Sequence, residues 1–200
     1  MDNPAPTHAQ AIRKPATIDQ AFVREVVGEF PHGSWKSLRG SNLSSSTEAN
    51  SKARSWKCVR CLHKVGGVYA FLFPESHFLE EREISLDGPL KRSIPFRFSH
   101  KTHPAHEGYV VAYVGKATNL SQRFKLHFSR TERSTVVQVR AGLVKSGFCV
   151  DRHLALDFML QHAVIRYREL TGDEHAANRD LLELSLCARF APPFNIKSER

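Results

Sequence analysis

The fold of this chain is decided by the stretch AYVGKATNLSQRFKLHF at residues 112–128. Its first residues are β-branched or aromatic and predict the end of a buried strand. Asn119 then stands where a helix would need an N-cap, and Gln122 follows three positions later, as in a capping box. The stretch therefore predicts a strand, a tight turn and a helix in direct succession.

The predicted helix carries two polar side chains beside its apolar side. Arg123 and His127 are four residues apart, so they stack on one face. The apolar stripe that they border consists of Leu120, Phe124 and Phe128. Both polar groups should lie at the rim of the buried surface rather than in open solvent. Packing of a helix on a sheet requires neither of them, nor Tyr113 on the strand.

The composition is that of a globular protein. Two hundred residues make about one domain, and 41% hydrophobic residues with thirteen Phe can form a core. No apolar run approaches the roughly 18 residues of a membrane span, and the N-terminus lacks the apolar stretch of a secretory signal. Four cysteines are too few for a disulfide scaffold, which favours a cytoplasmic location.

The net charge of +9 is concentrated in two zones. Residues 1–66 hold ten Lys and Arg against five Asp and Glu, and residues 109–150 hold seven against one. Clustered cations attract phosphates, so this pattern favours a nucleic-acid partner. Bound to DNA, the protein would be associated with the nucleoid. The alternative is that the charge serves solubility alone.

Composition and hydrophobic periodicity predict the other elements. In chain order these are a polar arm at 1–18, a helix at 17–30 capped by Thr17, a serine-rich linker at 41–55, strands at 66–73 and 109–115, a long segment at 74–108, helices at 134–146 and 154–163, a strand at 163–170, and a helix at 174–190. The first two strands are apolar on both faces, so we expect them to be covered on both sides.

The last helix places a carboxylate among apolar residues. At 100° per residue, Glu183 lies in the apolar arc, whereas Asn178, Ser185 and Arg189 define the opposite, polar face. Burying a carboxylate without a partner costs several kcal/mol, so a cation should meet it. That cation is either an arginine or a metal ion.

Taken in order, these residues resemble the GIY-YIG nuclease superfamily. GVY at 67–69 stands at the first tripeptide of that family, and YVG at 113–115 stands at the second. Arg123 and His127 follow at the family's spacing, and Glu183 precedes Asn195 by twelve positions, as in the nuclease module of the bacterial excision-repair incision protein. The resemblance covers residues 66–75 and 109–196.

The resemblance implies an α/β fold, with a small mixed sheet of about three central strands flanked by helices. Residues 1–56 would then be a basic N-terminal extension, partly helical and partly disordered. Residues 57–200 would be the nuclease domain, with an insertion at 74–108 between the first two strands. The implied activity is metal-dependent endonucleolytic cleavage of DNA.

The resemblance also implies roles for the site residues. Tyr69 would be the general base, which requires positive charge to lower its pKa, and His127 would accept or relay the proton. Tyr113 would orient the water or a phosphate oxygen, and Arg123 would bind phosphate. The remaining expected roles are one Mg²⁺ or Mn²⁺ ion held by Glu183, a positioning function for Asn195, and DNA contacts from Lys116, Lys125 and Arg130.

Several alternatives stay open at this point. The chain could be a non-catalytic nucleic-acid-binding module, or a repair or mobile-element nuclease rather than a restriction-like one. Cleavage of both strands would suggest a dimer. CVRC at 58–61 with His63 supplies half of a zinc site, but no second half follows nearby. His100, His103 and His106 could face a phosphate or bind a metal.

Overall fold

The computed structural model describes residues 18–43, 57–77, 82–85, 93–96, 108–129 and 138–195. Its centre is a four-stranded sheet in the order β1-β6-β2-β5. The bounds of the strands are Lys36–Arg39 for β1, Val164–Glu169 for β6, Gly67–Pro74 for β2 and Tyr109–Ala117 for β5. Each neighbouring pair in this sheet is antiparallel. The α/β class is confirmed, but the expected mixed sheet of about three strands is wrong.

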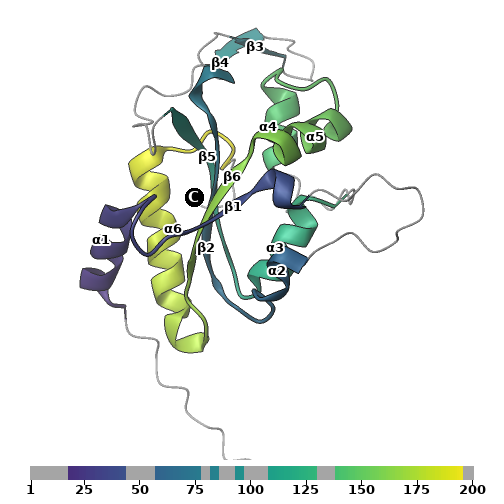
Figure 1. Cartoon of the computed structure of the whole chain (residues 1–200). Coiled ribbons are helices and arrows are strands. Elements are labelled where there is room, and N and C mark those ends of the chain that lie inside the picture. Colours follow the sequence, from purple (N-terminus) through teal and green to yellow (C-terminus); the bar gives the residue numbers. More distant parts are fainter. Residues whose placement is uncertain are drawn as a thin grey trace, which may run out of the picture.

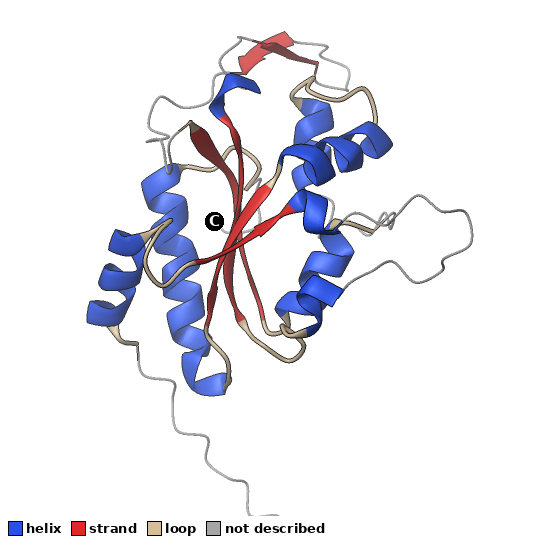
Figure 2. Ribbon diagram, viewed as in Figure 1, coloured by secondary structure: helices blue, strands red, loops and turns tan. Residues whose placement is uncertain are grey.

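Helices cover both faces of this sheet (Figures 1 and 2). On one face lie α6 (Ala176–Phe190) and α1 (Gln20–Glu29), which pack against each other. The opposite face carries α2 (Lys57–Arg60), α3 (Leu120–His127), α4 (Gln138–Lys145) and α5 (Arg152–His162). The sheet is therefore the middle layer of three.

Strand β2 shows why two helical layers are needed. Its residues alternate between the two faces, and seven of its eight are buried. Tyr69 and Phe71 belong to the core beneath α3, whereas Val68 and Ala70 belong to the core beneath α6. The expectation of strands covered on both faces is confirmed for β2 and β5, but only β2 is a central strand, because β5 lies at the edge of the sheet.

The helix that decides the fold begins where the sequence predicts. Asn119 accepts a hydrogen bond from the backbone N–H of Gln122 at 3.0 Å. The N-cap of α1 is Asp19 rather than the predicted Thr17, which lies outside the described residues, because the Asp19 carboxylate accepts from the N–H of Phe22 at 2.9 Å. Asp151 caps α5 in the same way, so that helix begins two residues before the predicted position.

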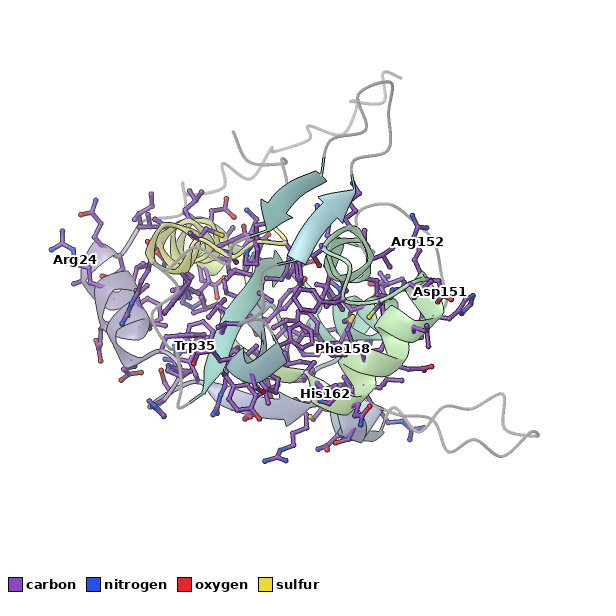
Figure 3. The ribbon with its side chains drawn as sticks, turned by 90° about the horizontal axis from the view of Figure 1, so that it is seen from above. Arg24, Trp35, Asp151, Arg152, Phe158 and His162 are labelled. Atoms are coloured by element: carbon purple, nitrogen blue, oxygen red, sulfur yellow. The ribbon has the colours of Figure 1, made fainter. Side chains whose placement is uncertain are left out.

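Strand β1 was not predicted, because only Leu38 of its four residues is buried. It pairs with β6 along Lys36–Arg39. Trp35 precedes it and donates from its indole Nε1 to the carbonyl of Val26 in α1 at 2.8 Å. Figure 3 shows Trp35 among the packed side chains, while Arg24 points away from the core. Residues 18–43 of the expected N-terminal extension thus complete the sheet and one of its covering layers.

The segment between β2 and β5 contains a second, two-stranded antiparallel sheet of β3 (Arg82–Ser85) and β4 (Ser93–Phe96). The other residues of the expected insertion that the structure describes are a 3₁₀ turn at Glu75–His77, which follows Pro74, and Gly108. His100, His103 and His106 lie outside the described residues.

Helix α6 differs from its predicted amphipathic pattern at one position. Asn178, expected on the polar face, is buried, and its Oδ1 accepts from the backbone N–H of Asp19 at 2.9 Å. The reason is that α1 covers this side of α6. Glu183 is buried as predicted, with 5% exposure.

Candidate active site

Two tyrosines, an arginine and a histidine meet at the junction between β5 and α3. The Tyr69 hydroxyl lies 2.8 Å from Nε2 of His127 and accepts from Nε of Arg123 at 2.9 Å. Arg123 also hydrogen-bonds the hydroxyl of Tyr113, and the two phenols hydrogen-bond each other. The four side chains therefore form one connected polar network inside an otherwise apolar core.

Strand register and helical spacing bring this network together. Tyr69 on β2 lies opposite Gly115 on β5, and Tyr113 lies opposite Phe71. Residues on one face of a strand are two apart, so Tyr113 and Gly115 share the face beneath α3. Arg123 and His127 are one turn apart on that helix and meet both tyrosines. Their predicted stacking is confirmed, although His127 is fully buried rather than at the rim.

Gly115 makes room for the network. A Cβ at this position would lie 2.6 Å from the Tyr69 hydroxyl and 2.9 Å from Cε1 of Tyr113. Real Cβ atoms do not approach other atoms so closely, so any larger residue would displace the phenols. Sequence reasoning treated Gly115 only as part of a motif, whereas the structure gives it a steric function.

Burial controls the protonation of the tyrosines. Loss of solvation raises the pKa of Tyr69 well above its ordinary value, and Tyr113 raises it further, whereas Arg123 acts in the opposite direction. The pKa of Tyr113 is raised as well, mainly by burial. The sequence predicted that positive charge would have to lower the pKa of Tyr69. Arg123 supplies that charge but does not outweigh burial, so both phenols are protonated at neutral pH.

Glu183 meets a lysine rather than an arginine. The Lys116 Nζ lies 2.7 Å from Oε2 of Glu183 and 3.2 Å from Oδ1 of Asp180, one turn earlier on α6. Partial burial lowers the pKa of Lys116, but the two carboxylates outweigh it and raise the pKa overall. A cation at Glu183 was predicted, but as an arginine or a metal ion. Asp180 was missed, although its position three residues before Glu183 on a helix was a usable signal.

The carboxylate pair has the donor chemistry of a Mg²⁺ or Mn²⁺ site. Both metals prefer hard oxygen ligands, and Mg²⁺ is commonly held by one or two carboxylates while it keeps several waters. Glu183 and Asp180 already bracket one cation, the ammonium of Lys116. Within the described residues there is no group of three or more acidic, His or Cys side chains around a common point.

The tyrosine network and the carboxylates lie on opposite faces of β5, which is an edge strand. Tyr113 and Gly115 point towards α3, so Lys116 points towards α6. The two parts are nevertheless close enough that the charge of Glu183 raises the pKa of Tyr113. The segment that ends at Asn195 covers the outer side of β5 at Ala112 and Val114, so a substrate that reaches both parts would lie at the Gly115–Ala117 end of the strand, where a pocket opens.

Asn195 holds the end of the described chain against that edge. Its Oδ1 accepts from the backbone N–H of Val114 at 2.8 Å, and its Nδ2 donates to the Val114 carbonyl at 2.7 Å. The N–H of Phe194 donates to the carbonyl of Ala112 at 3.0 Å. These bonds occupy backbone groups of β5 that face away from β2. The positioning function expected of Asn195 would therefore act on the terminal segment.

A surface pocket of about 210 Å³ opens beside the site. It is lined by Lys116, Ala117, Thr118, Asn119, Gln122, Arg123 and Leu126. Lys116 therefore borders both the carboxylates and this pocket, and Arg123 borders both the phenols and this pocket. Lys125 lies on α3, outside the pocket lining, and Arg130 lies outside the described residues.

The predicted zinc half-site is only partly described. Cys61 is exposed, and so is His63 two residues later. The side chain of Cys58 lies outside the described set.

Comparisons with protein-family models, with curated protein sequences and with solved structures gave no match. In the part of the chain that the structure describes, no helix is long and apolar enough to cross a membrane.

Proposed function

We propose that this protein is a metal-dependent DNA endonuclease that hydrolyses phosphodiester bonds at the edge of β5. The observation that carries the proposal is the connected set of Tyr69, Tyr113, Arg123 and His127 next to the Glu183 carboxylate. Core packing does not require buried polar groups from three separate elements, and burying them costs free energy unless they pair. Titratable groups with strongly shifted pKa values, such as Tyr69, cluster at functional sites.

The residue types suit phosphoryl transfer. The guanidinium of Arg123 is planar, always charged and matched to phosphate oxygens, and it is the member of the network that reaches the pocket. A phosphate seated there would meet Arg123 and Lys116. Glu183, with Asp180 beside it, would hold the divalent ion, which when bound stabilises charge on the phosphoryl group.

Proton transfer would run through Tyr69. Its high pKa makes it a poor base if it must first ionise in isolation. His127 lies within hydrogen-bond distance, so Tyr69 can pass its own proton to Nε2 of His127 while it takes one from the attacking water. This relay requires Nε2 of His127 to be unprotonated. Because Tyr69 is fully buried, the water must approach from the side of Arg123 and the pocket.

Cleavage of supercoiled plasmid DNA with and without Mg²⁺ tests the proposal. Glu183→Gln keeps the side-chain shape but removes the charge, and we expect it to lower the cleavage rate by at least about a hundredfold. Asp157→Asn removes an exposed carboxylate on α5 and serves as the matched control. If the parent protein binds DNA but never cuts, the chain is a binding module. If Glu183→Gln cuts as fast as the parent, the metal assignment is wrong.

A further inference from the structure

Lys116 is the cation that balances the most deeply buried carboxylate of the site. The Glu183 side chain is only 6% exposed, whereas that of Lys116 is 42% exposed. Their charged atoms are 2.7 Å apart. An isolated carboxylate at such a position would be costly, so Lys116 stabilises the site when no other cation is present.

The two partners of this ion pair differ in their freedom to move. Glu183 projects from the middle of α6, where Leu182 and Leu186 anchor the helix in the core. Lys116 stands near the end of an edge strand, and its ammonium is carried on a flexible four-carbon chain. If the pair opens, Lys116 moves and Glu183 stays.

The freed ammonium would have an adjacent place to go. Lys116 lines the pocket that Arg123 also lines, and the remaining lining residues of that pocket carry no charge. Two cations facing one small pocket would repel each other unless an anion lay between them. A phosphate of bound DNA is the anion that the proposed function supplies.

We infer that Lys116 holds the place of the divalent ion at Glu183 and is released to a DNA phosphate when the carboxylate takes up metal. This inference rests on the proposed function. It makes metal binding and DNA binding mutually favourable, because each removes the ion pair that the other must break. In the metal-free protein, the ammonium of Lys116 is paired with Glu183. Of the two cations that line the pocket, Arg123 is then the one available to a phosphate.

A titration with Mn²⁺ at pH 8 tests whether Lys116 competes with metal at Glu183. Binding is monitored by the loss of the paramagnetic resonance signal of the free ion. Lys116→Met removes the competitor, and we expect it to bind Mn²⁺ roughly three- to tenfold more tightly than the parent. Lys145→Met removes the same charge from the exposed end of α4 and should leave the affinity within twofold. If Lys116→Met does not fold, Lys116→Arg provides the test, and we expect weaker Mn²⁺ binding because its fork grips a carboxylate more firmly.

Fluorescence anisotropy with a labelled single-stranded oligonucleotide tests whether Lys116 is released to DNA, in a Tyr69→Phe background in which cleavage should be about a hundredfold slower. Mg²⁺ should strengthen DNA binding several-fold, and adding Lys116→Met should abolish that gain. An unchanged or weaker Mn²⁺ affinity in Lys116→Met would overturn the inference while leaving the metal site in place. Equal Mn²⁺ binding by the parent and Glu183→Gln would instead overturn the metal site, and with it the proposed function.

Discussion

Replacing Gly115 with alanine perturbs the site through a single methyl group. The added Cβ would lie 2.6 Å from the Tyr69 hydroxyl oxygen, 2.8 Å from its Cζ and 2.9 Å from Cε1 of Tyr113. Tyr69 has nowhere to retreat, because it is fully buried and packs edge-on against Phe124 with ring centres 5.4 Å apart. Either the phenols or the backbone of β5 must shift.

Overpacking of a well-packed core costs about 1–3 kcal/mol of unfolding free energy. The smaller entropy of the unfolded chain with alanine offsets about 0.4–1 kcal/mol of this. For a chain of this size, each kcal/mol moves the midpoint of thermal unfolding by about 2–4 °C. We therefore expect Gly115→Ala to lower the midpoint by several degrees. A displacement of the phenols by about 1 Å would also reduce cleavage by about a hundredfold.

Gly28→Ala is the matched control, because it makes the same chemical change in open space. A Cβ at Gly28 would meet nothing within 4 Å, and the residue lies in α1. Alanine has the higher helix propensity, by up to about 1 kcal/mol, so this variant should be slightly stabilised. Thermal unfolding by circular dichroism and plasmid cleavage measure both variants. Equal shifts in the same direction would refute the packing of Tyr69 against Gly115.

Three further predictions follow from the network and the edge of β5. Tyr69→Phe should reduce cleavage by about a hundredfold or more, and cost about 1–3 kcal/mol in denaturant unfolding, because Arg123 and His127 lose their hydrogen bonds to the Tyr69 hydroxyl. Tyr69 and Tyr113 should ionise above pH 10 in an absorbance titration, and because their pKa values are raised in the folded state, their contribution to stability should be fully present below pH 10 and be lost as the pH rises above it. The variant that carries both Tyr69→Phe and Tyr113→Phe should lose less stability above pH 10 than the parent protein does. Asn195→Ala should cost about 1–3 kcal/mol and speed amide exchange at Val114, whereas unchanged exchange would remove its role at the edge.

Local sequence patterns were enough for most elements near the site. The helix at Asn119 begins as predicted because its cap is a contact within four residues. The burial of Glu183 followed from helical periodicity for the same reason. Asn178 shows the limit of this method, since periodicity placed it on the polar face and α1, more than 140 residues away in sequence, covers it.

The features that were missed depend on distant pairing. Strand β1 is four residues long with one buried side chain, so its sequence carries almost no strand signal, and its pairing with β6 defines it. The ion pair between Lys116 and Glu183 was not predicted, because no local pattern links β5 to α6. Likewise, the pKa of Tyr69 depends on complete burial by three elements, and not on the nearby arginine alone.

The sequence by itself determined helices α3 and α6, the burial of β2 and β5 on both faces, the stacking of Arg123 with His127 and the need for a cation at Glu183. Each of these depends on spacing along one element, where the geometry of a helix or strand is fixed. Only the tertiary structure decided the antiparallel four-strand order, the steric role of Gly115 and the choice of Lys116 as partner of Glu183. Those features depend on register between separate elements, which is set by packing of the whole core.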